Sequence, residues 1–192
     1  MGKAIQKHWK KPGWIVLIVA ALFLIAGLDP MTKDALKVGH ILRTIERHST
    51  NKTAKEKTAE VTETELNAYI AHRIEQENAS IIKSIQITLL KHNHVKGLIR
   101  FDSKTLKLAS LLGENLDFDF KGILHSIDGR AKMEFISLYL CGQPVNPQVL
   151  DFVLDTAAAG YGVDGRDEKG WYDLPKGMKT IEIDKQRLTL TY

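Results

Sequence analysis

Glycine spacing gives the first candidate for chemistry in this chain. Gly160, Gly162 and Gly165 match the pattern GxGxxG, which binds dinucleotide phosphates when it follows a strand and opens a helix. Here a helical pattern precedes the glycines and a charged stretch follows them. We therefore expect a loop at residues 161–170 and no nucleotide site.

Two histidines could supply metal ligands. His92 and His94 alternate along the chain and could point to one side of a strand, but metal centres usually need a third ligand. The pair lies in a turn-like stretch, residues 91–96, so we favour polar turn residues. Elsewhere, four further histidines show no metal-binding spacing: His40, His48, His72 and His125.

Carboxylates and the single cysteine give no clearer signal. Asp164, Asp167 and Glu168 do not match the twelve-residue loop that binds calcium. Cys141 has no recognisable catalytic partner, and no serine stands in a GxSxG elbow. The sequence therefore predicts a noncatalytic protein, with no metal and no cofactor.

The strongest signal is an uncharged segment, residues 12–28, which would span about 26 Å as a helix. A hydrocarbon core is about 30 Å thick, so the segment is a short but workable membrane helix. We expect an uncleaved signal anchor, with a cleaved signal peptide or a buried soluble helix as alternatives. The predicted membrane-spanning side chains are Trp14, Ile15, Val16, Leu17, Ile18, Val19, Leu22, Phe23, Leu24 and Ile25.

Charge gives the orientation of this segment. The chain has 27 Lys and Arg against 23 Asp and Glu, and the lysines before Trp14 account for the whole excess: Lys3, Lys7, Lys10 and Lys11. Basic flanks stay on the cytoplasmic side. We therefore expect a single-pass protein of the bacterial inner membrane with a periplasmic C-terminal domain, or a periplasmic protein if the segment is cleaved. Its expected partners are membrane lipid and envelope proteins, and nucleic acid is excluded because the rest of the chain is electrically balanced.

The chain after this segment divides by composition. Residues 1–30 form the anchor or signal peptide, residues 31–60 a short helix and polar linker, and residues 61–192 the exported domain. Apolar spacing predicts the helix at 34–48, whereas residues 49–60 contain no large apolar side chain. That polar stretch fits a linker between domains or an exposed loop within one domain.

Two helices and several strands are expected in the exported domain. Thr62 and Glu65 have the spacing of a capping box that opens a helix at residues 62–78. Period-two alternation predicts strands at 85–89, 95–102 and 116–121, and Asp128-Gly129 predicts a hairpin turn into a strand at 131–140. After a break at residues 142–147, we expect a helix at 147–159 and a final hairpin at 178–183 and 187–192. The predicted fold class is α+β, an antiparallel sheet wrapped on a long helix with a second capping helix.

This order of elements resembles the small bacterial exported proteins related to the tubular lipid-binding (TULIP-like) group. The resemblance covers residues 61–192 and rests on the loose patterns TETELNAYI and LPKGMKTIEIDKQRLTLTY. It implies binding of lipid or another apolar ligand in the cell envelope, without catalysis.

From the apolar faces we expect a groove between sheet and helix, with a fully packed core as the alternative. Its expected lining is Leu66, Tyr69, Ile70, Phe118, Phe120 and Phe152. The competing function is a structural or interaction protein that presents its sheet or its charged loop to an envelope partner.

Overall fold

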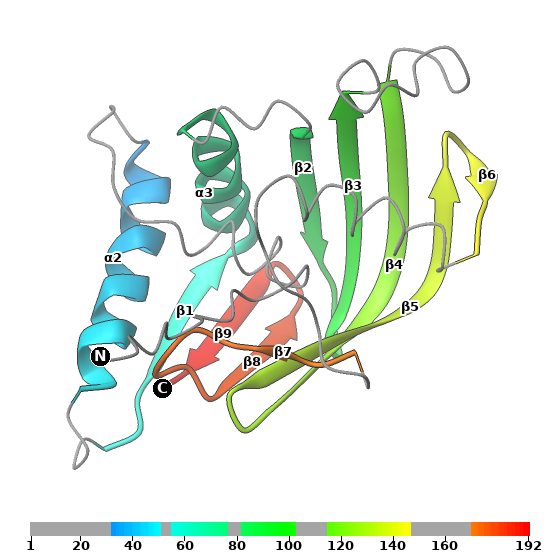
Figure 1. The fold of residues 1–192 in the computed structure, drawn as a ribbon. Helices are drawn as coiled ribbons and strands as arrows, with labels where there is room; N and C mark the ends of the chain where they lie inside the picture. The colour runs from blue at the N-terminus through cyan, green and yellow to red at the C-terminus, as the bar shows by residue number, and fades with distance from the viewer. Residues whose placement is uncertain (1–31, 51–54, 77–81, 103–114, 147–169) are drawn as a thin grey trace, which may run out of the picture.

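The computed structural model describes residues 32–50, 55–76, 82–102, 115–146 and 170–192 (Figure 1). This part of the chain is a mixed α+β structure, as predicted. Its helices are α2 (Lys33–His48) and α3 (Glu63–Gln76). Its strands are β1 (Thr58–Thr62), β2 (Ile82–Leu89), β3 (His94–Asp102), β4 (Asn115–Ile127), β5 (Arg130–Leu140), β6 (Gln143–Pro144), β7 (Tyr172–Asp173), β8 (Thr180–Asp184) and β9 (Arg187–Thr191).

Helix α2 confirms the amphipathic pattern. Thr32 caps it, because its hydroxyl oxygen accepts a hydrogen bond of 3.3 Å from the Ala35 amide. Its apolar stripe, made by Ala35, Val38, Leu42 and Ile45, is buried in the same core as the rest of the described chain. The helix expected before residues 61–192 therefore shares one core with them.

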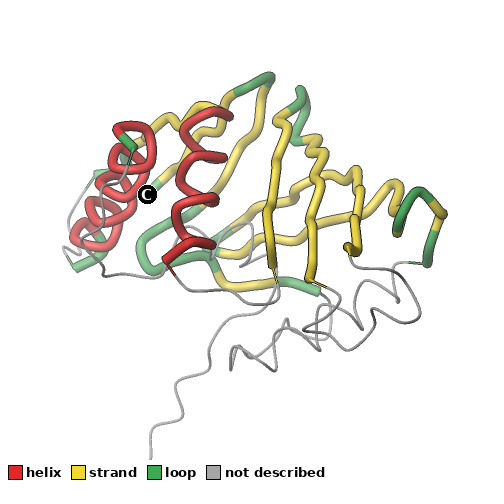
Figure 2. Tube along the Cα trace, turned by 90° about the horizontal axis from the view of Figure 1, so that it is seen from above, coloured by secondary structure: helices red, strands yellow, loops and turns green. Residues whose placement is uncertain are grey.

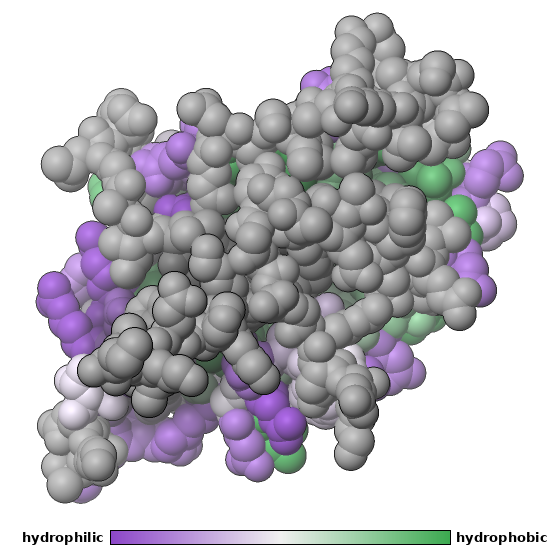
Figure 3. Space-filling model, in the orientation of Figure 1, coloured by the Kyte–Doolittle hydropathy of each residue, from purple (hydrophilic) through white to green (hydrophobic). Residues whose placement is uncertain are grey.

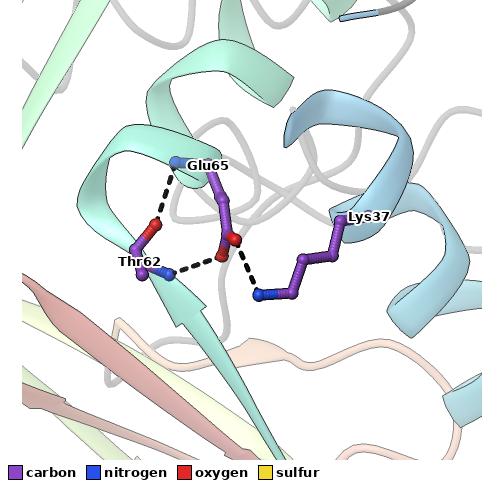
Figure 4. Close-up of polar contacts among 3 residues, drawn as sticks. All are labelled: Lys37, Thr62 and Glu65. Atoms are coloured by element: carbon purple, nitrogen blue, oxygen red, sulfur yellow. Dashed lines mark hydrogen bonds and ion pairs between the residues drawn. The ribbon is translucent and has the colours of Figure 1, made fainter. Parts of the chain in front are cut away.

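The capping box of α3 forms as predicted (Figure 4). The Thr62 amide donates to Glu65 Oε2 at 2.9 Å, and the Glu65 amide donates to the Thr62 hydroxyl at 3.3 Å. Lys37 of α2 donates to the other carboxylate oxygen of Glu65 at 2.6 Å. One carboxylate thus starts α3 and also joins it to α2, which lies beside it in Figures 1 and 2.

A curled antiparallel sheet forms the larger layer, in the order β2-β3-β4-β5-β6, and β7 pairs with the other end of β5. Side chains alternate between a buried and a wetter face, as the period-two pattern predicts. Asp128 and Gly129 have φ values of 47° and 74°, which fits the predicted tight turn between β4 and β5. Helix α3 packs against β2 and β1, at one side of the curled sheet (Figure 2).

The terminal hairpin belongs to a second sheet, in the order β1-β9-β8. The prediction that residues 49–60 are entirely linker or loop is wrong at its C-terminal end, where Thr58, Ala59 and Glu60 pair with β9. Because these residues lack large apolar side chains, no alternation marks them as a strand. Their strand structure comes from pairing with β9, which is distant in sequence. Val61, the next residue, is fully buried.

The predicted break at residues 142–147 also contains paired backbone. Gln143 and Pro144 form β6 on the edge of β5. Three predicted features lie outside the described residues: the helix at 147–159, residues 161–169 of the predicted loop 161–170, and the whole segment 12–28. Within the described ranges, neither helix has the length and apolar character needed to cross a bilayer.

The Glu65 carboxylate is electrostatically tuned by its contacts. Burial raises its pKa, but the hydrogen bonds from Lys37 and Thr62 and the Lys37 charge outweigh that effect, and the pKa falls below its ordinary value of 4.5. A carboxylate with a lowered pKa in the folded state stabilises the fold at neutral pH. This stabilisation is lost as the pH falls through the lowered value.

We predict that Glu65→Gln destabilises the protein most at neutral pH, and that its difference from wild type shrinks below about pH 4.5. Urea unfolding of both proteins at neutral and acidic pH, followed by circular dichroism, measures this difference. Glu60→Gln is the matched control, because Glu60 is exposed and its pair with Arg187 is 3.5 Å long. A difference that is independent of pH would contradict the assignment.

Candidate functional site

The buried face of the curled sheet is the candidate site, and we name it the inner face. Every long strand of this sheet contributes to it because the alternation places every second residue on that side. Its buried apolar side chains are Ile85, Ile87, Leu89, Val95, Ile99, Phe101, Leu116, Phe118, Phe120, Leu124, Ala131, Met133 and Leu138.

Aromatic pairs organise the middle of the inner face. Phe101 of β3 and Phe118 of β4 meet edge to face with ring centroids 5.5 Å apart. Phe120 and Phe135 of β5 repeat this geometry at 5.6 Å. Edge-to-face rings are the preferred arrangement for aromatic pairs and fix side-chain orientation across strands. The aromatic contacts therefore join three adjacent strands, β3, β4 and β5.

A glycine makes room for one of these rings. Gly97 of β3 stands directly opposite Phe120 of β4. A Cβ atom on Gly97 would lie 2.2 Å from two carbons of the Phe120 ring. The Phe120 ring thus lies over the backbone of β3 at Gly97. The side chain of any larger residue at position 97 would occupy the space of the ring.

The structure places five of the six predicted lining residues in one core. On α3, Leu66, Tyr69 and Ile70 are 2%, 5% and 0% exposed. On β4, Phe118 and Phe120 are 0% and 5% exposed. The α3 residues lie at the β2 side of the sheet, two strands from β4, so the two groups occupy different parts of the core. Phe152 lies outside the described residues, as do the ten predicted membrane-spanning side chains.

The free edge of β2 is closed by side chains of α3. Asn67 acts like a piece of strand: its Oδ1 accepts from the Ile87 amide and its Nδ2 donates to the Ile87 carbonyl, both at 2.7 Å. The Glu63 carboxylate accepts from the Leu89 amide at 2.7 Å. These contacts satisfy backbone groups that would otherwise lack partners beside the helix.

The free edge of β8 is closed in the same way by the curled sheet. The Ile183 amide donates to Asn93 Oδ1 at 2.6 Å, and the Asn93 amide donates to the Ile183 carbonyl at 3.0 Å. The Ser126 hydroxyl accepts from the Ile181 amide at 2.9 Å. The two sheets are thus joined by polar contacts at an edge.

Sequence reasoning missed Asn67, Glu63, Asn93 and Ser126. One signal was available for Asn67, a polar residue beside the apolar stripe of an otherwise predictable helix. No local pattern marks the partners of the other three, because each bonds a residue distant in sequence.

The histidine pair lies where the turn interpretation predicts. His92 and Asn93 both have φ of 59°, and His94 begins β3. Within the described part of the chain, no group of three His, Cys, Asp or Glu side chains is arranged to hold a metal ion. Cys141, the single cysteine of the chain, is exposed. The glycine and acidic motifs at residues 160–168 lie outside the described residues.

The fold and this face define an α+β protein with a curled antiparallel sheet and an apolar inner face. The chain matches no protein-family model. It also has no significant match among curated proteins or solved structures. The resemblance to the tubular lipid-binding group therefore stays a prediction.

We predict that Asn67→Ala destabilises the protein by about 2–4 kcal/mol, because it leaves the amide and carbonyl of Ile87 without their partner. Urea unfolding measures the loss. The matched control is Gln86→Ala, an exposed neighbour on β2, which should change stability by less than about 0.5 kcal/mol. Equal effects of the two substitutions would refute the edge-closing role.

We also predict that Gly97→Ala costs about 1–3 kcal/mol, because the new methyl group must displace the Phe120 ring. Thermal unfolding and the near-ultraviolet circular dichroism of the aromatic rings report the change. Lys96→Ala, on the exposed side of the same strand, is the control. An unchanged aromatic signal in Gly97→Ala would show that the ring does not depend on this space.

Proposed function

We propose that this chain is a noncatalytic, membrane-anchored envelope protein that binds lipid or another apolar ligand on the inner face of the curled sheet. The observation that supports the proposal best is the continuous apolar lining contributed by β2, β3, β4 and β5. Burying an acyl chain against such a surface is worth about 0.8 kcal/mol for each methylene group.

The aromatic residues suit this role. Phe118 and Phe120 are held by partners on the neighbouring strands, Phe101 and Phe135. Ligand sites are commonly lined by apolar and aromatic side chains that are fixed in advance. Phe118 and Phe120 lie on β4, two strands from α3. The proposed ligand position is therefore near the middle of the curled sheet.

The location in the envelope rests on sequence. The uncharged segment 12–28 and its preceding lysines support an anchor with the described domain on the far side of the membrane. An anchored domain of this kind meets lipid at high local concentration. This also agrees with the implication of the TULIP-like resemblance.

A second candidate function, a structural or interaction protein, is favoured by one surface feature. Ile136 and Tyr139 on β5 are 52% and 41% exposed, although both are large apolar side chains. Within the described residues, no strand pairs with the 132–137 stretch of β5 on its outer side. Such an edge can accept a strand from a partner protein.

Photo-crosslinking separates the candidates. The full chain is reconstituted into vesicles that contain a fatty acid with a diazirine at its tail, irradiated and mapped by peptide mass spectrometry. We expect labelled peptides from β4 and β5, besides any label within residues 12–28. Label confined to residues 12–28 would contradict ligand binding at the inner face and favour the interaction role.

A matched pair of variants tests the position. Leu138→Phe adds bulk at the buried position opposite Phe120, and we expect it to lower the β4 label at least twofold. Ile136→Phe adds a ring on the exposed side of the same strand and should leave the label unchanged. Circular dichroism confirms that both variants are folded before the comparison.

A further inference from the structure

Helix α2 has a second face that the core does not use. Lys33, Leu36, His40, Arg43 and Arg47 follow helical spacing and form one outward stripe, opposite the buried residues of this helix. All five are exposed, and Leu36 keeps 46% of its surface in contact with solvent. We call this set the outward stripe. In the space-filling view, the described atoms on the flank over α2 are mainly hydrophilic (Figure 3).

The outward stripe is cationic. It contains no acidic residue, because the helical rotation places Glu46 about 60° from Arg43 and Asp34 about 100° from Lys33. Among the described residues, Lys37 beside the stripe is paired with Glu65, whereas no ion pair engages Lys33, Arg43 or Arg47. The positive charge of this face is therefore available to an external anionic surface.

The length of chain before α2 limits what this face can meet. The uncharged segment ends at Leu28 and α2 begins at Lys33, a separation of at most about 17 Å. If the segment spans a membrane, α2 starts within the headgroup layer or directly above it. A helix with cations around an exposed leucine suits that position, since cations attract anionic headgroups and the leucine can enter the boundary.

We propose that the outward stripe of α2 docks on the anionic membrane surface and fixes the orientation of the domain above the bilayer. This inference rests on the anchored location in the proposed function. It adds a specific surface and a specific partner, a lipid surface carrying anionic headgroups. Docking would hold α3 and the β2 side of the sheet near the bilayer, because α3 packs between α2 and β2.

A nitroxide label tests the contact in the full chain. Leu36→Cys in a Cys141→Ser background receives the label, and the protein is reconstituted in vesicles of phosphatidylcholine alone or mixed equally with phosphatidylglycerol. We expect the label at position 36 to contact lipid in the anionic vesicles only. The native Cys141, labelled in the unsubstituted chain, should remain in water in both kinds of vesicle because β5 and β6 lie at the far side of the domain (Figure 1).

Charge removal provides the matched comparison. Each cation near an anionic surface contributes about fivefold to binding, so Arg43→Gln with Arg47→Gln should lower the ratio of lipid-contacting to aqueous label about 25-fold. Lys91→Gln with Lys96→Gln removes the same charge from exposed positions on the β2–β3 hairpin and should have no such effect.

Two results would overturn the inference. One is a label at position 36 that stays in water in anionic vesicles although carbonate extraction shows that the chain is inserted. The other is equal lipid contact in neutral and anionic vesicles. A chain that carbonate extracts contradicts the anchored location itself, and the crosslinking of the inner face reports independently on ligand binding.

Discussion

The architecture depends on closing the free edges of two sheets with polar side chains. A strand edge beside packed elements exposes amides and carbonyls that must find partners, or the packing becomes unfavourable. Asn67 and Glu63 give β2 those partners from α3. Asn93 and Ser126 give them to β8 from the curled sheet. Helix, curled sheet and terminal hairpin are joined by these hydrogen bonds, around which the apolar side chains pack.

Edge closure satisfies the backbone at the rim of the sheet, and the apolar side chains of the inner face pack together in the core. Because α3 is fixed on the β2 edge, it covers the β2 side of the sheet, while Phe118 and Phe120 lie two strands away. There the packing is determined by the aromatic rings and by Gly97, which leaves room for the Phe120 ring because it has no side chain. The proposed ligand position and the capped edge are therefore separate parts of one core, with different chemistry.

Much of the fold could be predicted from local patterns. The capping box of Thr62 and Glu65 and the turn at Asp128 and Gly129 form because neighbouring residues supply all the necessary groups. Strand β1 escaped prediction because its polar side chains give no alternation, and only pairing with β9 makes it a strand. The candidate site was predictable as a set of apolar residues. Their division between α3 and β4 was not, because it depends on the order of strands in the sheet.

By itself, the sequence determined the period of each element, the caps and turns, and the uncharged segment with its basic flank, since these follow from residues close together in the chain. The tertiary structure alone decided which edges meet which side chains. Asn67 bonding Ile87, and Asn93 bonding Ile183, join residues 20 and 90 positions apart. Such contacts have no local signature, because a backbone edge can accept any suitably placed polar group, and the folded chain selects the one that arrives there.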